Sequence, residues 1–370
     1  MLKEVLIIFP DPHLSYSPST LNLYDSLSEY FKVTIITSIP DKSYSDQRIL
    51  VKNVKYLNSD NGIPLIDRLA TEVKKTFASN TGYVRLLTPK AKELIKGIKE
   101  FQGIIIAVDF FALWCAQEAG KKVHFVSLEI PQHDAYRSAC DLTNIHSVII
   151  QTIDRYKYLF GQMHMKTFIV QNAPKYIDRK IDFNKRSTTK LICLGSALPA
   201  FGIFNCIEFI MDYSEYTLVI KGAIPPSVRH SIKQHYQFLL DENRLILNDS
   251  YLEPNQLNSF LSECHIGFVF YDACRFDGIN TFNFHTAPSG KLFQYYNAGV
   301  PVVTSNISGL NSVKEFGAGI MISSLNARSI KNAITQIDNN YYEFAENAKK
   351  AAAYFDFSKS IEPFVTFLKN

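Results

Sequence analysis

The sequence predicts an α/β protein with two consecutive domains, each a parallel sheet covered by helices on both faces. Its 370 residues leave room for two domains of roughly 150 residues each. Apolar residues make up 46% of the chain and charged residues 20%, which supplies two cores and excludes a disordered protein. Short runs rich in valine and isoleucine alternate with amphipathic stretches, a pattern typical of buried parallel strands separated by helices.

The charge and the N-terminus exclude two other classes of protein. The net charge is +4 without a long run of like charges, so the electrostatic footprint of a nucleic-acid binder is missing. The apolar run 5–9 is too short for a signal-peptide core and is broken by Pro10. No stretch approaches the length of a membrane span, so we expect a cytoplasmic protein.

The first half contains seven expected strands and two clear helices. A helix over 20–30 follows Ser17-Pro18-Ser19, which supplies a capping serine and an N-terminal proline. The next clear helix covers 111–118. The strands are expected at 6–9, 33–36, 54–57, 103–108, 123–128, 148–151 and 168–170.

The alternation restarts after a polar stretch, 178–190, which carries five positive charges and two acids and which we interpret as a linker. We therefore expect an N-terminal domain at 1–178, a second domain at 190–340, and a helical segment at 341–370 that is broken at 355–358 and packs back on the first domain. The expected strands are 191–194, 217–220, 245–247, 266–270, 302–304 and 320–322, and the expected helices are 226–239, 255–262 and 290–298.

No dinucleotide or P-loop glycine pattern follows the first strand of either half. The six cysteines contain no pair at zinc-ligand spacing, which favours reduced core thiols. His230 and His235 lack a metalloprotease glutamate and are interpreted as surface or structural residues. We therefore expect neither a metal nor a bound cofactor.

The most informative segment is 287–305. Pro288 and Ser289 suit a helix start, Gly299 suits its end, and a strand follows. Free N–H groups and the helix dipole attract phosphate at such a start, and Lys291 adds a full positive charge there. Gln294 lies one turn further along the same face.

This segment resembles the signature of GT-B glycosyltransferases, in which a Ser-x-Lys helix start leads to a helix ending Ala-Gly-x-Pro-Val-Val. Segments 169–174, 219–222 and 251–270 resemble other parts of that family's second domain, and 125–130 with 148–155 look like strands of bacterial members related to family 4. The resemblance implies two Rossmann-like, doubly wound domains facing across a cleft. It also implies transfer of a sugar from a nucleotide diphosphate sugar to a glycan, lipid-linked or protein acceptor, in bacterial surface polysaccharide or glycoconjugate synthesis.

The chain departs from family 4 at two places. Retaining members carry two glutamates eight positions apart, where this sequence has Thr286 and Gln294. They also carry an arginine and a lysine where this chain has Ser196 and Phe201. Lys291 with Gln294 instead resembles the glucuronosyltransferase of xanthan synthesis, whose equivalent residues hold the nucleotide diphosphate. Retaining and inverting mechanisms both stay open.

A departing diphosphate requires local positive charge, which we assign to Lys291, Lys221 and Arg275. Lys221 follows a strand and is equally well explained as a surface lysine. Arg275 lies in a long loop, 271–287, expected to have no structure of its own, and such loops usually serve function. The full set of expected donor-binding residues is Gly195, Lys221, Tyr271, Arg275, Ser289, Gly290, Lys291 and Gln294.

An inverting enzyme also needs a general base, normally a carboxylate or histidine of the first domain. Glu129 and Asp109 each directly follow an expected strand, where site residues gather. A cap or salt bridge is the alternative for Glu129, and a helix cap is the alternative for Asp109. Asp11 and His13 are a third choice, with a turn formed by Asp-Pro as the plainer explanation.

Two other functions share this pattern. A nonhydrolysing sugar-nucleotide 2-epimerase has the same two-domain plan, and the missing glutamate pair suits a nucleotide-sugar-binding scaffold without catalysis. The seven basic residues between 74 and 99 fit either a solvated helix face, which is favoured, or peripheral contact with the inner face of a membrane.

Overall fold

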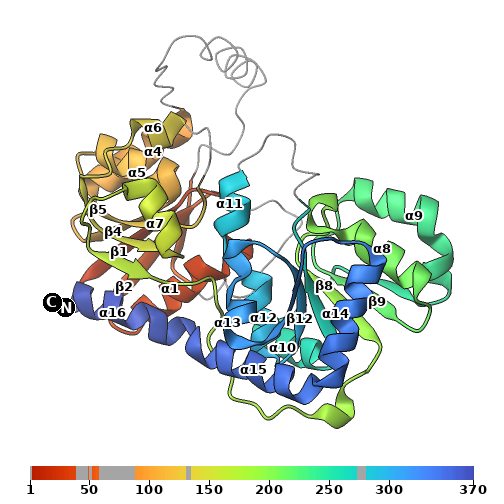
Figure 1. Cartoon of the computed structure of the whole chain (residues 1–370). Helices are drawn as coiled ribbons and strands as arrows, with labels where there is room; N and C mark the ends of the chain where they lie inside the picture. The colour runs from red at the N-terminus through yellow and green to blue at the C-terminus, as the bar shows by residue number, and fades with distance from the viewer. Residues whose placement is uncertain (1, 39–48, 50–51, 58–87, 131–134, 273–280) are drawn as a thin grey trace. The chain divides into compact units, whose positions relative to one another are not determined.

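The computed structural model describes residues 2–38, 49, 52–57, 88–130, 135–272 and 281–370. The chain forms two compact units, one containing residues 1–170 and 361–370 and the other containing residues 171–360. Each unit is built on one parallel sheet with helices packed against it (Figure 1).

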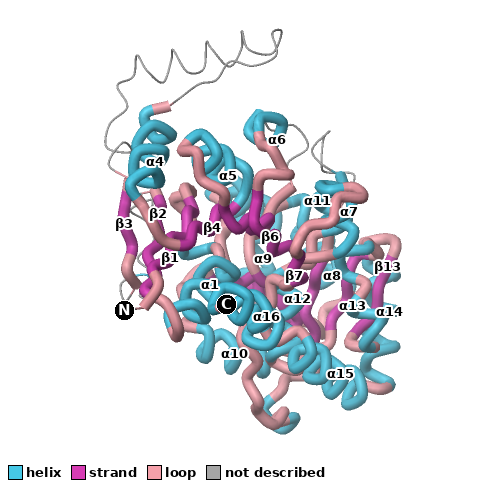
Figure 2. The backbone as a smooth tube through the Cα atoms, turned by 90° about the vertical axis from the view of Figure 1, so that its left-hand side faces the viewer, coloured by secondary structure: helices cyan, strands magenta, loops and turns pink. Residues whose placement is uncertain are grey.

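The sheet of the first unit has seven parallel strands in the order β3-β2-β1-β4-β5-β6-β7 (Figure 2). Its inner strands are valine- and isoleucine-rich and buried on both faces, as a doubly covered sheet requires. The strands are β1 (Glu4–Phe9), β2 (Lys32–Thr37), β3 (Val54–Tyr56), β4 (Ile104–Val108), β5 (Val123–Ser127), β6 (Ile145–Ile150) and β7 (Thr167–Ile169). The helices are η1 (Leu14–Tyr16), α1 (Pro18–Ser28), α4 (Pro89–Glu100), α5 (Asp109–Glu118), α6 (Ala135–Ala139) and α7 (Ile153–Phe160).

The C-terminal end of α16 (Phe357–Lys369) packs on the first unit. Lys3 Nζ donates to the Lys369 carbonyl at 3.2 Å, so the two termini lie side by side (Figure 1). Phe364 packs edge-on against Phe168 and His124, with ring centroids 5.2 and 5.5 Å away. Burial lowers the pKa of His124 to about 4, so this histidine is a neutral part of the core at physiological pH.

The sheet of the second unit has six parallel strands in the order β10-β9-β8-β11-β12-β13. The strands are β8 (Lys190–Leu194), β9 (Thr217–Lys221), β10 (Leu245–Asn248), β11 (Ile266–Val269), β12 (Val302–Ser305) and β13 (Gly319–Ile322). The helices are η3 (Phe183–Lys185), η4 (Pro199–Phe201), α8 (Ile203–Asp212), α9 (Pro226–Asp241), α10 (Pro254–Ser262), α11 (Thr281–Thr286), α12 (Gly290–Asn297), η6 (Ser308–Leu310), α13 (Ser312–Phe316), α14 (Ala327–Asn339) and α15 (Tyr341–Tyr354).

Successive side chains of this sheet enter two different cores. On β8, Leu191 and Cys193 join a cluster with α8, α9 and α14, whereas Ile192 joins a cluster with α10, α12, α13 and α15. The same alternation occurs on β9 and β12. Each face of the sheet is therefore sealed by its own layer of helices.

Every strand and helix expected from the sequence is present, with ends that differ by a few residues, and the break near 355–358 separates α15 from α16. Two expectations were wrong. The loop 271–287 contains a helix, α11, and the polar stretch 178–190 belongs to the second unit, where Arg186 is buried. Most of the basic stretch 74–99 lies outside the described residues.

Helix α12 is fixed to the sheet through Tyr295. The Tyr295 ring lies against Gly267 of β11, where an added Cβ atom would stand 2.7 Å from the ring. Its hydroxyl accepts from Leu194 N at 2.8 Å and donates to the Ile192 carbonyl at 3.1 Å. A buried tyrosine thus locks α12 onto β8 and β11 with a satisfied hydroxyl.

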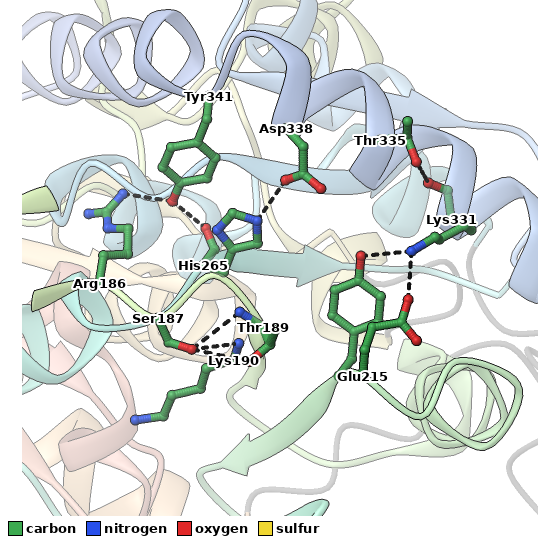
Figure 3. A network of polar contacts seen from close by, with 11 residues as sticks. Arg186, Ser187, Thr189, Lys190, Glu215, His265, Lys331, Thr335, Asp338 and Tyr341 are labelled. Atoms are coloured by element: carbon green, nitrogen blue, oxygen red, sulfur yellow. Dashed lines mark hydrogen bonds and ion pairs between the residues drawn. The ribbon is translucent and has the colours of Figure 1, made fainter. Parts of the chain in front are cut away.

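Two buried cations hold the C-terminal end of α12. The Arg186 guanidinium donates to the carbonyls of Ala298 and Gly299 at 3.2 and 2.8 Å. It also donates to the hydroxyl of Tyr341 at 2.8 Å (Figure 3). That hydroxyl in turn donates to the His265 carbonyl at 2.6 Å. Lys349 Nζ lies 3.4 Å from the Asn297 carbonyl. Positive charge at this end complements the helix dipole.

The contact between Gly267 and Tyr295 leads to a prediction about stability. We expect Gly267→Ala to destabilise the protein by about 1–3 kcal/mol, because an added methyl group overpacks a site with no space. Gly97→Ala is the control, since a Cβ atom at Gly97 in α4 meets no atom of the described residues within 4 Å and alanine favours a helix. Urea unfolding should show a loss for the first variant and none for the second; equal midpoints would contradict the packing argument.

Candidate functional site

The donor-site candidates gather where the strand order of the second sheet reverses. Strands β8 and β11 are neighbours, but the chain leaves β8 toward β9 and leaves β11 toward β12, so their connections diverge. Ligands of open α/β sheets bind at this point, beyond the carboxyl ends of the strands. Here η4 follows β8, Tyr271 follows β11, and Lys291 lies in the first turn of α12.

The Lys291 ammonium lies over aromatic rings contributed by separate parts of the chain. Its Nζ is 4.4 Å from the centroid of the Phe201 ring and 5.6 Å from that of Tyr271. Phe284 of α11 contacts both rings, with centroid distances of 6.4 and 5.6 Å. We call Phe201, Tyr271 and Phe284 the aromatic cradle.

Lys291 makes no hydrogen bond or ion pair with any residue of the described ranges. Burial lowers its pKa to about 8, with a smaller opposing effect from the thiols of Cys193 and Cys206. A half-buried ammonium that lacks an anionic partner, at a helix start, suits an anionic ligand.

Three other expected donor residues lie at this helix start or in the turn after it. Ser289 is the N-cap residue, and its hydroxyl makes no capping hydrogen bond. Gly290 begins the helix, and a Cβ atom there would meet, among the described residues, only Asn172, at 3.6 Å. The half-buried amide of Gln294, one turn after Lys291, has no hydrogen-bond partner in the described part of the chain.

Two expected donor residues are engaged within the protein. Lys221 is buried and its ammonium donates to the Ser250 carbonyl. Gly195 N donates to the Lys221 carbonyl at 2.9 Å. Tyr271 N donates to Ser305 Oγ at 2.8 Å, which leaves its ring for the cradle. Arg275 lies outside the described residues.

In the first unit, Asp109 lies at the equivalent reversal point, directly after β4 and beside β1. It has a φ of 60°, which is uncommon for a residue with a side chain. Its carboxylate accepts from Leu128 N at 2.8 Å and from Glu129 N at 3.0 Å. It therefore ties the end of β5 to β4 rather than capping α5.

Burial raises the pKa of Asp109 to about 7, and the N–H groups of Glu129 and Leu128 act in the opposite direction. The buried Arg155, which donates to the Leu128 carbonyl at 2.9 Å, lowers this pKa only slightly. Glu129 is exposed beside this group. A carboxyl whose pKa lies near 7, on a residue with an uncommon backbone conformation, is typical of a functional site.

The remaining candidates have plainer places. Asp11 Oδ1 accepts from His13 N at 2.7 Å, which is the turn contact expected of an Asp-Pro segment. Within the described ranges, no group of three histidine, cysteine or acidic side chains is arranged to hold a metal. No helix of the described residues is long and apolar enough to cross a membrane.

Comparisons place this geometry among known folds. No model of a protein family and no curated protein matches the chain by sequence. Solved structures do match. Anabaena HepE, crystallised with UDP and glucose, has a TM-score of 0.69 at 15% identity over all of both chains. The UDP-forming trehalose-phosphate synthase of Burkholderia xenovorans, with glucose-6-phosphate, has a TM-score of 0.64 at 10% identity over all of both chains.

The chain has the GT-B fold. HepE and the trehalose-phosphate synthase are GT-B glycosyltransferases, and both units of this chain have the corresponding parallel-sheet architecture. A Listeria monocytogenes protein assigned as a UDP-N-acetylglucosamine 2-epimerase is also similar, with a TM-score of 0.61 at 16% identity over all of this chain and 96% of that one.

The pKa of Asp109 leads to a prediction about stability. The folded protein holds this proton up to about pH 7, whereas the unfolded chain releases it near 3.8, so stability falls as pH rises between these values. Asp109→Asn removes the buried charge and keeps an oxygen acceptor, and asparagine tolerates the positive φ. We expect a gain of roughly 3–4 kcal/mol at pH 8 and little change at pH 4.

Urea unfolding at both pH values measures this difference. Glu129→Gln is the control, because this neighbouring side chain is exposed. A gain for Asp109→Asn that is equal at pH 4 and pH 8 would rule out a buried charge as its cause.

Proposed function

We propose that the protein is a glycosyltransferase that moves a sugar from a nucleotide diphosphate sugar to an acceptor. One observation carries the proposal: Lys291, an ammonium without an anionic partner in the described chain, lies at the start of α12 where the strand order of a GT-B sheet reverses. The similar HepE structures hold UDP, which favours a uridine diphosphate sugar as donor.

In this proposal the diphosphate binds at the start of α12. The N–H groups of the first turn and Lys291 neutralise the charge that grows on the diphosphate as the bond to the sugar breaks. Gln294 and the Ser289 hydroxyl provide neutral hydrogen bonds. Because protein groups supply this charge, the reaction needs no metal ion. The Lys-x-x-Gln spacing supports a donor site like that of the xanthan glucuronosyltransferase within the broad family 4 group.

Asp109 is the proposed general base of an inverting reaction. Its Oδ1 is held by two backbone N–H groups, and no other hydrogen-bond donor reaches the carboxyl from the described residues. A carboxyl with a pKa near 7 can take the proton of an acceptor hydroxyl as that oxygen attacks the sugar. Glu129 is the second candidate, on the exposed side of the same strand end.

The acceptor is a glycan, a lipid-linked glycan or a protein, bound by the N-terminal domain expected at 1–178, while the second domain expected at 190–340 binds the donor. We propose a cytoplasmic role in surface polysaccharide or glycoconjugate synthesis, with peripheral contact at the membrane where the acceptor is a lipid. A sugar-nucleotide 2-epimerase is the second candidate, favoured by the similarity to the Listeria protein.

Removing the Lys291 charge should slow the cleavage of the donor, measured as the rate at which UDP forms. We expect Lys291→Ala to lower kcat/KM about 100-fold for the best donor among UDP-glucose, UDP-N-acetylglucosamine and UDP-glucuronate, because one preorganised charge is lost. Lys314→Ala, which removes an exposed lysine of α13, is the matched control and should keep full activity. Full activity of the Lys291 variant would exclude the assigned role.

The same assay separates the alternatives. An epimerase would convert UDP-N-acetylglucosamine to its 2-epimer, visible by NMR. A scaffold would bind UDP in calorimetry and turn over no donor with any acceptor.

Asp109 and Lys291 together should give kcat/KM a bell-shaped pH dependence. We expect an acid limb near pH 7, where Asp109 must be ionised, and an alkaline limb near pH 8, where Lys291 loses its charge. Asp109→Asn should remove the acid limb and reduce kcat by about 100-fold or more. Glu129→Gln should retain the limb; its loss in that variant would move the role of base to Glu129.

A further inference from the structure

We propose that Phe201 and Tyr271 are positioning residues that hold the Lys291 ammonium by their ring faces and aim it at a diphosphate, an inference that rests on the proposed donor site. In this proposal the orientation of the ammonium depends on the aromatic rings as well as on Lys291 itself.

The geometry of the cradle supports this role. Lys291 Nζ is 4.4 and 5.6 Å from the two ring centroids, within the range of a cation–π contact. The Phe201 and Tyr271 rings are nearly perpendicular, at 85° with centroids 5.5 Å apart, so they present two walls to the ammonium. Phe284 packs against both rings and fixes their orientation.

The charges around Lys291 explain why rings are needed. Burial disfavours the ammonium, and the positive end of the α12 dipole disfavours it further, because Lys291 lies in the first turn. No carboxylate of the described residues pairs with it. The negative ring faces of Phe201 and Tyr271 therefore stabilise the charge before a ligand arrives.

A positioning role and ordinary packing predict opposite changes in the pKa of Lys291. If the Phe201 ring stabilises the charge, its replacement by leucine lowers the pKa of Lys291, because burial and the helix dipole remain. If the ring only fills space, its replacement loosens the site, admits water and raises the pKa of Lys291 toward the usual value of lysine.

The experiment measures the rate at which acetic anhydride modifies Lys291 at different pH values, without nucleotide, by peptide mass spectrometry. Phe201→Leu removes the ring and keeps an apolar side chain, whereas Phe201→Tyr retains an aromatic ring. Phe204→Leu is the matched control, because this ring of α8 contacts Tyr236 and makes no cation–π contact with a described residue. Calorimetry with UDP then measures binding by each variant.

We expect Phe201→Leu to shift the modification midpoint of Lys291 to lower pH and to weaken UDP binding about fivefold at pH 8, in line with the loss of one cation–π contact. Phe201→Tyr and Phe204→Leu should leave both quantities unchanged. A midpoint that stays constant or rises in Phe201→Leu would overturn the proposal.

Failure of the proposed function has a different signature. If the unmodified protein binds neither UDP nor a uridine diphosphate sugar, the donor site is wrong, whatever the modification midpoints are. If it binds UDP and Phe201→Leu binds equally well, only the positioning role is overturned.

Discussion

The contact between Tyr295 of α12 and Gly267 of β11 determines where the start of α12 lies. Because glycine leaves space above β11, the tyrosine ring can lie flat on the sheet while its hydroxyl bonds to the backbone of β8. Helix α12 is thus anchored to the two strands whose connections diverge. Its first turn, with Lys291, is consequently fixed at the carboxyl edge of the sheet, where α/β proteins bind ligands.

The two ends of α12 differ in how their charge is balanced. At the C-terminal end, Arg186 and Lys349 are buried and donate to backbone carbonyls, so their positive charge meets the negative end of the dipole. At the N-terminal end, Lys291 meets the positive end of the dipole, and its ammonium lies over the rings of Phe201 and Tyr271 without an anionic partner among the described residues. The positive charge at the start of α12 is therefore left unneutralised, and a bound anion would neutralise it while the helix keeps its place.

The sequence was informative wherever a local pattern determines structure. Runs such as 191–194 and 302–304 predicted strands correctly because a strand buried on both faces must be continuously apolar. The start of α12 was predictable from Pro288 and Ser289, and Lys291 from its place in that turn. The cradle was not, since residues 201, 271 and 284 are brought together only by the fold. Arg186 was missed because a charged stretch resembles a linker, and burial of its guanidinium depends on distant carbonyls.

Asp109 shows a different limit of sequence reasoning. An aspartate after a strand and before a helix most often caps that helix. Here the positive φ turns its carboxylate away from α5 and toward the N–H groups that follow β5. The positive φ strains the backbone, and burial disfavours the ionised carboxyl. Among the described residues, Arg155 offsets this effect only in part. Lys291 is held in a comparably unfavourable state in the other unit. Two charged groups left incompletely balanced, each at the reversal point of its own sheet, are better explained by selection for chemistry than for stability.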